Sequence, residues 1–303
     1  MSRKSAANKS NAGERILKFV GTAFILIALA LFIWLGWLAI QERGEIETQQ
    51  DLQDLFEKSA SAISSFGMPS ALAEEETAGG EELPAEERRI SERLLELREI
   101  NFDLIGWLEV GEQISTPVVY RDNKFYLEHD FYGKESVNGT VFADVKNVNW
   151  ETDPYVVLYG HNMRNGSMFG TLDEFQSLEH LIENSRIVFY SLYDDAVLEF
   201  IPFAVVDASM EKNHSSYLKL RNFEAFANPE DMTAAEAFIS ELIDRSLFEI
   251  PGIDVTTEDR IFALTTCSYK LPNARLTVFC RQLREGETLE ALQEHVKINA
   301  KAK

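Results

Sequence analysis

The hydrophobic positions near the N-terminus form one continuous block. Residues 19–40 run apolar without a charged side chain, and Trp34 and Trp37 lie near the far end of this block. A helix rises about 1.5 Å per residue, so the block is long enough for the roughly 30 Å hydrocarbon core of a membrane. Residues 1–18 are basic and the chain after the block is acidic. This asymmetry predicts a single-pass anchor in the cell membrane, with the N-terminus cytoplasmic and the rest extracellular. A cleaved signal peptide is the alternative, although the block is long for one.

Polar sequence follows the apolar block. Residues 41–65 carry Ile46, Leu52 and Phe56 at near-helical spacing, which predicts a juxtamembrane helix. Residues 67–84 contain a glycine pair and runs of glutamate, a composition typical of a flexible acidic linker. The predicted order is a basic tail over 1–18, the anchor over 19–40, a helix and acidic linker over 41–84, and a folded domain over 85–303 that starts with a helix.

From residue 101 onward the pattern changes to short apolar and β-branched runs separated by Gly, Asn and Asp. This pattern predicts an all-β domain, either a barrel or a sandwich. One helix interrupts the strands, because Thr233 and Glu236 form a capping-box pattern ahead of an apolar stripe that ends at Leu247. Residues 284–303 predict a short C-terminal helix. The expected strands are 106–110, 116–120, 140–145, 155–159, 186–192, 197–206, 261–266 and 275–282.

Composition narrows the possible partners. The formal net charge of −21 argues against a nucleic-acid partner, because a phosphate backbone needs a basic surface. Hydrophobic residues make up 45% of the chain, enough for a folded core. The two cysteines exclude a disulfide-rich framework. Cys280 lies in an apolar run, so we expect a small buried residue there rather than a disulfide partner of Cys267.

The candidate chemistry begins at the last two predicted strands. Cys267 ends one strand and Arg275 begins the next, with a turn over 270–274 between them. The two side chains should therefore face each other across the mouth of a hairpin. A guanidinium beside a thiol stabilises a thiolate and can hold a developing negative charge. A base is still missing from this pair.

His161 is the best candidate for that base among the five histidines of the chain. It follows the apolar strand 155–159 directly, and the polar, glycine-bearing loop after it suits an open cleft. His129, in a loop, is a weaker candidate. A metal site built from His161, His129 and Cys267 lacks a close-spaced pair of ligands. Together, Cys267, His161 and Arg275 predict a nucleophile, a proton carrier and an electrophilic clamp for acyl transfer. No carboxylate lies near them in the sequence to complete a papain-like triad.

These residues and their surroundings resemble the sortase family, most closely its class B. The helix over 233–247 and the N-terminal helices also look like those of class B. The resemblance covers residues 85–283 and the anchor. Glu128 departs from the pattern, because many class B relatives carry Asn there. The matching motifs are Leu264-Thr265-Thr266-Cys267, Arg275, Leu158-Tyr159-Gly160-His161-Asn162-Met163, Ile105-Gly106-Trp107-Leu108, Pro117-Val118-Val119 and Tyr126-Leu127-Glu128-His129-Asp130-Phe131-Tyr132-Gly133.

The resemblance implies a mainly β fold, an eight-stranded sortase-type barrel with N-terminal helices and one long helix inserted between late strands. It implies a membrane-tethered cysteine transpeptidase of Gram-positive bacteria. Such an enzyme cleaves a secreted protein at a C-terminal sorting motif after Thr, holds the acyl group as a thioester, and passes it to an amine of a peptidoglycan precursor or a pilin. No metal or cofactor is implied. The implied roles are Cys267 as nucleophile, His161 as general acid and base, Arg275 as oxyanion and substrate clamp, and Tyr159, Thr265 and Thr266 as lining of the motif groove.

Other functions stay open on the residues. A pilus-type enzyme would use a lysine amine of another subunit as acceptor. A plain cysteine hydrolase would use water in place of the amine. A non-catalytic barrel would bind peptides in its cleft, with Cys267 merely buried.

Overall fold

A computed structural model describes residues 3–65, 89–194, 196–268 and 273–303. The chain divides into two compact units, Met1–Gln49 and Gln50–Lys303. Helix α1 (Arg3–Ser65) makes up the described part of the first unit and ends in the second. The helix predicted over 41–65 is thus a continuation of α1. The linker predicted over 67–84 lies outside the described residues.

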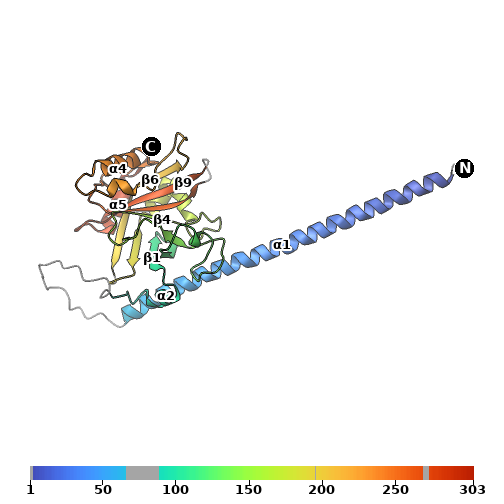
Figure 1. The fold of residues 1–303 in the computed structure, drawn as a ribbon, viewed down its shortest axis with the longest axis horizontal. Helices are drawn as coiled ribbons and strands as arrows, with labels where there is room; N and C mark the ends of the chain where they lie inside the picture. Colours follow the sequence, from blue (N-terminus) through green and yellow to red (C-terminus); the bar gives the residue numbers. More distant parts are fainter. Residues whose placement is uncertain (1–2, 66–88, 195, 269–272) are drawn as a thin grey trace. The chain divides into compact units, whose positions relative to one another are not determined.

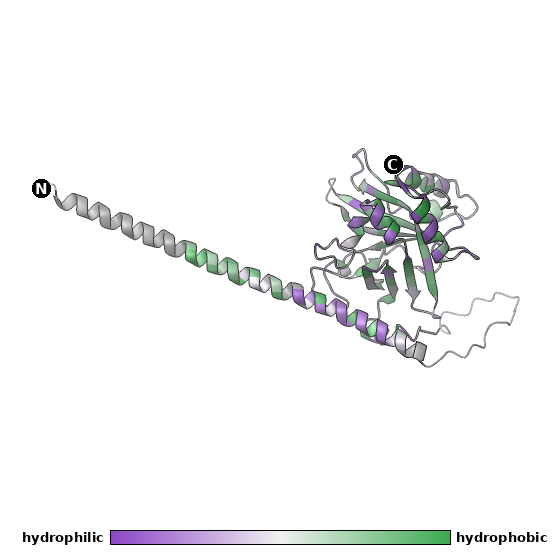
Figure 2. Cartoon of the chain, turned by 180° about the vertical axis from the view of Figure 1, so that it is seen from behind, coloured by the Kyte–Doolittle hydropathy of each residue, from purple (hydrophilic) through white to green (hydrophobic). Residues whose placement is uncertain are grey.

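The membrane prediction is wrong. Figure 2 shows an apolar stretch within α1 that gives way to polar residues. In the described part of the chain, however, no helix combines the length with the apolar character that crossing a membrane requires. The single-pass anchor over 19–40 is therefore overturned, together with the membrane partner and the localisation that rested on it.

The second unit is built around a closed barrel of eight strands (Figure 1). Neighbouring strands pair antiparallel except for β2 with β3 and β4 with β8, which pair in parallel. The prediction of a mainly β fold with an eight-stranded barrel is confirmed. In the order of pairing, the strands are β1 (Leu104–Val110), β2 (Ile114–Val119), β3 (Val141–Ala143), β4 (Tyr155–Tyr159), β8 (Ile261–Ser268), β9 (Ala274–Gln282), β6 (Val197–Ser209) and β5 (Ile187–Ser191).

Helices and one small sheet complete this unit. The helix predicted over 85–100 is helical only from Leu95 within its described part, which begins at residue 89. The short strands β7 (Phe248–Glu249) and β10 (Lys301–Ala302) pair with each other. The helices are α2 (Leu95–Ile100), η2 (Phe125–Leu127), η3 (Thr171–Gln176), α3 (Leu178–Glu183), η4 (Phe223–Phe226), α4 (Thr233–Arg245) and α5 (Leu289–Asn299).

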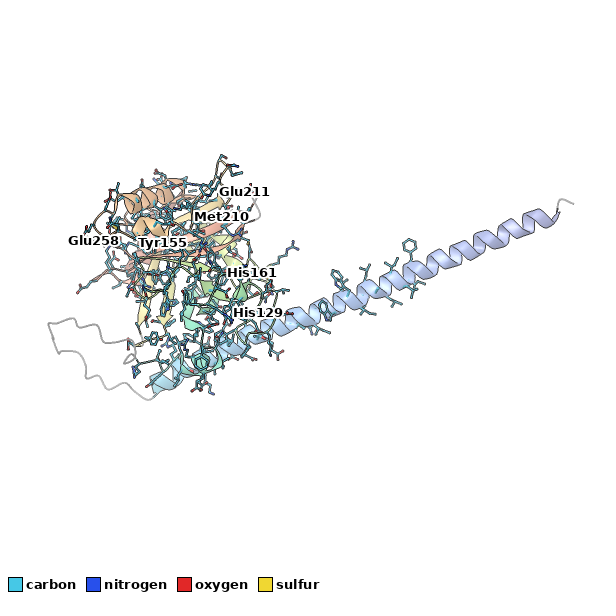
Figure 3. The ribbon with its side chains drawn as sticks, viewed as in Figure 1. His129, Tyr155, His161, Met210, Glu211 and Glu258 are labelled. Carbon is cyan, nitrogen blue, oxygen red and sulfur yellow. The ribbon has the colours of Figure 1, made fainter. Side chains whose placement is uncertain are left out.

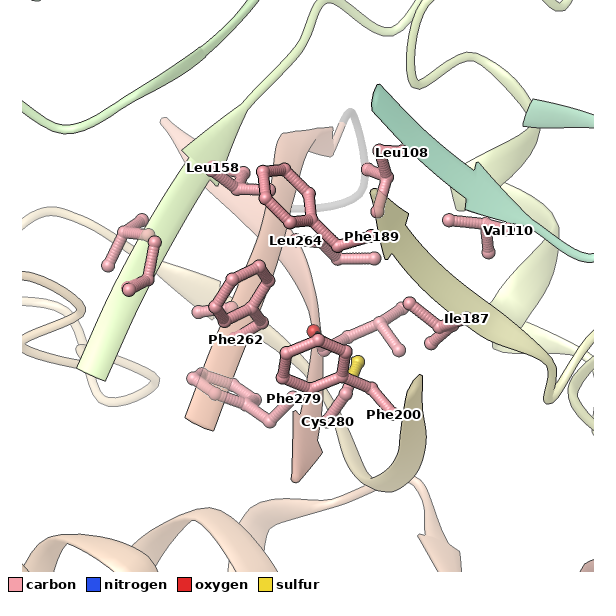
Figure 4. Packing of buried hydrophobic residues seen from close by; sticks show 14 of the residues in the cluster. Leu108, Val110, Leu158, Ile187, Phe189, Phe200, Phe262, Leu264, Phe279 and Cys280 are labelled. Carbon is pink, nitrogen blue, oxygen red and sulfur yellow. Dashed lines mark hydrogen bonds between the residues drawn. The ribbon is translucent and has the colours of Figure 1, made fainter. Parts of the chain in front are cut away.

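Aromatic and aliphatic side chains of the barrel strands form the hydrophobic core (Figure 4). Phe262 and Leu264 lie two positions apart on β8, so both point to the same face. The ring of Phe200 lies 4.2 Å from that of Phe262, and the ring of Phe189 lies 5.6 Å from it. Each such buried ring stabilises the fold by roughly 1.5–3 kcal/mol. Cys280 lies in this core without exposure, which confirms its predicted burial.

The last turns of α1 pack on the outside of the barrel. Phe56 stacks on Trp107 with 4.4 Å between ring centroids, and both side chains are buried. The Gln53 amide donates a hydrogen bond of 2.8 Å to the Ser115 carbonyl. These contacts are the reason that residues 50–65 belong to the barrel unit.

Helix α4 lies between β6 and β7 in the chain, which confirms the inserted helix. It begins at Thr233, but the predicted capping box does not form, because Met232 is the N-cap and makes no side-chain cap hydrogen bond. Asp231 instead accepts a hydrogen bond from the Thr233 amide. Helix α4 packs against β6, and its Phe238 makes a T-shaped contact with Tyr155 of β4, with 5.6 Å between ring centroids.

Candidate active site

Strands β4, β8 and β9 bring three segments of the sequence to one edge of the barrel. Strands β4 and β8 are parallel neighbours with Tyr159 opposite Thr265, so their carboxyl ends meet. Strand β9 returns antiparallel to β8, and Cys267 and Arg275 are register partners. His161 lies two residues beyond the end of β4. The pairing of strands therefore gathers these residues from positions more than 100 apart.

All six site residues predicted from the sequence line one open cleft of about 200 Å³. His129 does not line it. The His129 ring stacks on Phe125 at 4.0 Å and its Nδ1 lies 2.8 Å from the Phe125 carbonyl oxygen. Figure 3 labels both histidines. The lining residues are Cys267, His161, Arg275, Tyr159, Thr265 and Thr266, together with Asn123, Leu127, Phe142 and Gly160.

Hydrogen bonds tie the strand that carries Cys267 to the segment that carries His161. The Asn162 side chain donates to the Cys267 carbonyl at 2.8 Å. The Thr266 hydroxyl donates to the Gly160 carbonyl at 2.9 Å. Gly160 has no room for a side chain, since a Cβ would lie 2.6 Å from the Phe169 ring. Cys267 itself is half-buried and is a free thiol.

A backbone carbonyl orients the imidazole of His161. Its Nε2 lies 2.7 Å from the Leu127 carbonyl oxygen, so in the neutral ring Nε2 carries the proton and donates it to that oxygen. The loop that supplies Leu127 also approaches the ring at Gly139, where φ is +61° and a Cβ would lie 3.2 Å from His161 Cδ2. Leu127 thus takes the orienting role that a carboxylate has in a triad.

Arg275 keeps most of its hydrogen-bonding capacity for the cleft. Its Nη1 donates to the Ala274 carbonyl at 2.9 Å and to Asn273 at 3.5 Å. Within the described residues, no carboxylate forms an ion pair with Arg275. A guanidinium in this state can bind a carbonyl oxygen or an oxyanion that enters the cleft.

The two threonines of the cleft have partners within the protein. Thr265 and Thr266 are each 1% exposed. Thr265 Oγ1 lies 3.2 Å from Thr277 Oγ1, and the Thr266 hydroxyl already donates to Gly160. Their contribution to the cleft is therefore the shape of its wall.

A buried carboxylate, Asp144, lies behind the cleft wall. Tyr159 donates its hydroxyl to Asp144 Oδ2 at 2.8 Å, and Asn123 donates to the same oxygen at 3.2 Å. Arg221 binds both Asp144 oxygens, at 2.7 and 2.9 Å. Burial alone would raise the pKa of Asp144, but the hydrogen bonds from Arg221, the Lys146 amide and Tyr159 outweigh it and hold that pKa below 3.8. Burial, followed by the Asp144 charge, raises the pKa of Tyr159, which stays a neutral donor.

Sequence reasoning missed the other side chains of this wall. Asn123 and Leu127 come from the loop between β2 and β3, and Phe142 is the middle residue of β3. None carries a group that local sequence marks as reactive. The pairing of β3 with β4 places Phe142 opposite Tyr159. Leu127 lies within one of the motifs matched to the sortase family, which was the available signal for this segment. In the part of the chain that the structure describes, no three His, Cys, Asp or Glu side chains are grouped to hold a metal ion.

Known proteins with similar sequence and fold were found, although no family model matches the chain. It is 26% identical over 259 residues to Sortase B of Listeria monocytogenes, covering 84% of this chain and 92% of that protein. The X-ray structure of Clostridium perfringens sortase B matches with 31% identity and a TM-score of 0.54, over 63% of this chain and 99% of that one. A Staphylococcus aureus sortase B–substrate complex matches with 19% identity and a TM-score of 0.61, over 82% and 100% of the two chains, which supports the fold.

Proposed function

Because the chain belongs to the class B sortase family, and is therefore a cysteine transpeptidase, we propose that it cleaves proteins at a C-terminal sorting motif after Thr. The acyl group is then transferred to an amine of a peptidoglycan precursor. The observation that supports this proposal is the shared cleft of Cys267, His161 and Arg275.

In the proposed first step, the Cys267 thiolate attacks the carbonyl carbon of the motif's Thr. The C–N bond breaks, and His161 gives a proton to the departing amine. Arg275 donates hydrogen bonds to the oxyanion that forms on the carbonyl oxygen, and this stabilisation is strongest in the transition state. The product is a thioester between Cys267 and the Thr acyl group.

In the proposed second step, the acceptor amine attacks the thioester carbonyl. The new amide bond forms as the C–S bond breaks, and His161 takes the proton that the amine loses. Cys267 leaves as the thiolate that begins the next cycle. Tyr159 lines the cleft and contacts the motif, and Thr265 and Thr266 shape the same side of the cleft.

Mass spectrometry with peptides and amines tests this proposal. The protein is incubated with a library of sorting-motif peptides, first without and then with an amine such as a glycine oligomer or a lysine peptide. We expect a thioester adduct on Cys267 and a transferred product that retains the peptide up to Thr. A product formed only with the lysine peptide would assign a pilin-type acceptor instead. The proposed transfer would be contradicted if only hydrolysis products formed at every amine concentration, or if no peptide formed an adduct with Cys267.

A further inference from the structure

Asp144 joins the cleft wall to a segment that is distant in the sequence. Its side chain has no exposure to solvent. Oδ2 accepts from Tyr159 and Asn123, both of which line the cleft. Arg221, which binds both oxygens, belongs to residues 210–232, the segment between β6 and α4.

Other contacts hold that segment, and Arg221 with it, in place. The Tyr155 hydroxyl, buried beneath α4, donates to the Leu220 carbonyl at 2.9 Å. Lys146, two residues after Asp144, forms an ion pair of 3.2 Å with Glu224. Figure 3 labels Tyr155 in the body of the barrel unit. Arg221 is thus presented to Asp144 by a segment anchored on both sides of it.

A buried carboxylate constrains its donors more strongly than a neutral acceptor does. Leaving such a charge without its partners is strongly unfavourable, so the hydrogen bonds around Asp144 form together. The fork of Arg221 fixes the plane of the carboxylate, because a bidentate pair allows one orientation. That plane in turn sets where the Tyr159 hydroxyl lies, and together with the Val145 amide, which donates to Asn123 Oδ1 at 2.8 Å, it positions the Asn123 side chain.

We propose that Asp144 is a positioning residue of the transpeptidase site, which holds Tyr159 and Asn123 against the motif and makes their placement depend on Arg221 and residues 210–232. Asp144 touches no substrate. Its kinetic consequence rests on the proposed function, whereas its effect on the orientation of Tyr159 does not. The two parts can therefore be tested separately.

A second buried aspartate gives a matched control. Asp259 has a side chain that is 4% exposed, and Arg284 binds both its oxygens at 2.7 and 2.6 Å. Asp259 accepts a further hydrogen bond from the Thr256 amide at 2.7 Å, as Asp144 does from Lys146 at 2.9 Å. It does not line the cleft. Asp259→Asn therefore removes a similar buried pair without touching Tyr159.

The first experiment measures orientation. The protein is labelled with ¹³C at tyrosine Cζ, and the Tyr159 signal is assigned by its loss in Tyr159→Phe. Asp144→Asn replaces one carboxylate oxygen, which accepts two or three hydrogen bonds, by an amide NH₂. This NH₂ is a donor and would face the donors that bind the carboxylate oxygen in the wild type. We expect the Tyr159 signal to shift in Asp144→Asn and in Arg221→Gln, and to stay in Asp259→Asn. An unshifted signal in Arg221→Gln would overturn the inference, and this variant decides alone if Asp144→Asn does not fold.

The second experiment measures the reaction with a peptide that the wild-type protein cleaves. We expect Asp144→Asn to raise KM about tenfold with little change in kcat, since a lost hydrogen bond to a charged group changes an equilibrium constant by roughly one order of magnitude. In the Tyr159→Phe background the same substitution should change KM much less. Equal KM values in Asp144→Asn and Asp259→Asn would overturn the inference. So would a double variant whose change in KM is the product of the changes caused by Asp144→Asn and Tyr159→Phe alone. A shifted Tyr159 signal in a protein that cleaves no peptide would instead remove the proposed function and leave the orientation result standing.

Discussion

The β8–β9 hairpin carries a cysteine and an arginine toward each of its two ends, and the two pairs have opposite surroundings. At one end, Cys267 and Arg275 are register partners that line the cleft. At the far end, Cys280 and Arg281 are neighbours in the sequence and are 0% and 1% exposed. The same two residue types on this hairpin therefore line the cleft at one end and are buried at the other.

The difference lies in what the rest of the fold does with each group. Arg281 binds both oxygens of Glu287, each at 2.7 Å, and its Nε donates to the Asp254 carbonyl at 2.9 Å. Burial raises the pKa of the Cys280 thiol well above its usual value. Arg275, by contrast, pairs with no carboxylate in the described ranges. The comparison teaches that an arginine can act on a bound substrate only where the fold does not already pair it with a carboxylate.

The largest expected effect separates the two cysteines. Cys267→Ala should abolish both thioester and transferred product, because the proposed nucleophile is gone. Cys280→Ala should retain transfer and lower the free energy of unfolding by about 1–2 kcal/mol, as expected for a small loss of buried volume. Peptide transfer read by mass and urea unfolding check the pair. A folded Cys280→Ala protein without transfer would break the comparison.

The two arginines should separate activity from stability. Arg275→Ala should lower kcat/KM about 10²–10³-fold, the usual cost of losing an oxyanion donor, and leave the unfolding free energy within about 0.5 kcal/mol. Arg281→Ala should cost about 3 kcal/mol of stability by breaking a buried pair, while the folded fraction keeps its activity. Kinetics and denaturant unfolding on both variants measure the contrast. Comparable losses of activity in the two variants would contradict it.

Alternation along the strands allowed much of this to be predicted. Cys280 lies five positions from Arg275, so it points to the opposite face and into the core. The strand over 155–159, followed at once by His161, also predicted where the base should emerge. Because β4 and β8 run parallel, their ends meet at one edge, and the predicted residues arrive in one cleft.

Alternation could not separate Arg275 from Arg281, which are six positions apart and share a face. Glu287 and Asp254, which engage Arg281, come from segments outside the hairpin. The Asp144–Arg221 pair joins residues 77 apart in the sequence for the same reason. Such partners follow from the packing of distant segments, which local spacing does not encode.

A smaller effect should follow from replacing each arginine by lysine. Arg275→Lys keeps the charge but loses the fork of donors, so we expect about a tenfold loss in kcat/KM. Arg281→Lys should leave activity unchanged and lower the unfolding free energy by about 1–2 kcal/mol, because one of two parallel hydrogen bonds to Glu287 is lost. The same kinetic and unfolding measurements apply. Full activity in Arg275→Lys would show that charge alone suffices in the cleft.

The smallest effect concerns the acid side of the stability profile. The hydrogen bonds from Arg281 hold the pKa of Glu287 below 4.5. A carboxylate whose pKa is lowered by folding adds stability above its unfolded value of 4.5, and this contribution is lost as the pH falls through the lowered value. Glu287→Gln should therefore be less stable than the wild type at pH 7, by about 1 kcal/mol, and should approach it near pH 2.

Arg275→Gln should follow the wild-type profile throughout, since Arg275 has no carboxylate partner in the described part of the chain. Urea unfolding across this pH range measures both, and a parallel offset of Glu287→Gln at every pH would show that the loss comes from packing rather than from the ion pair.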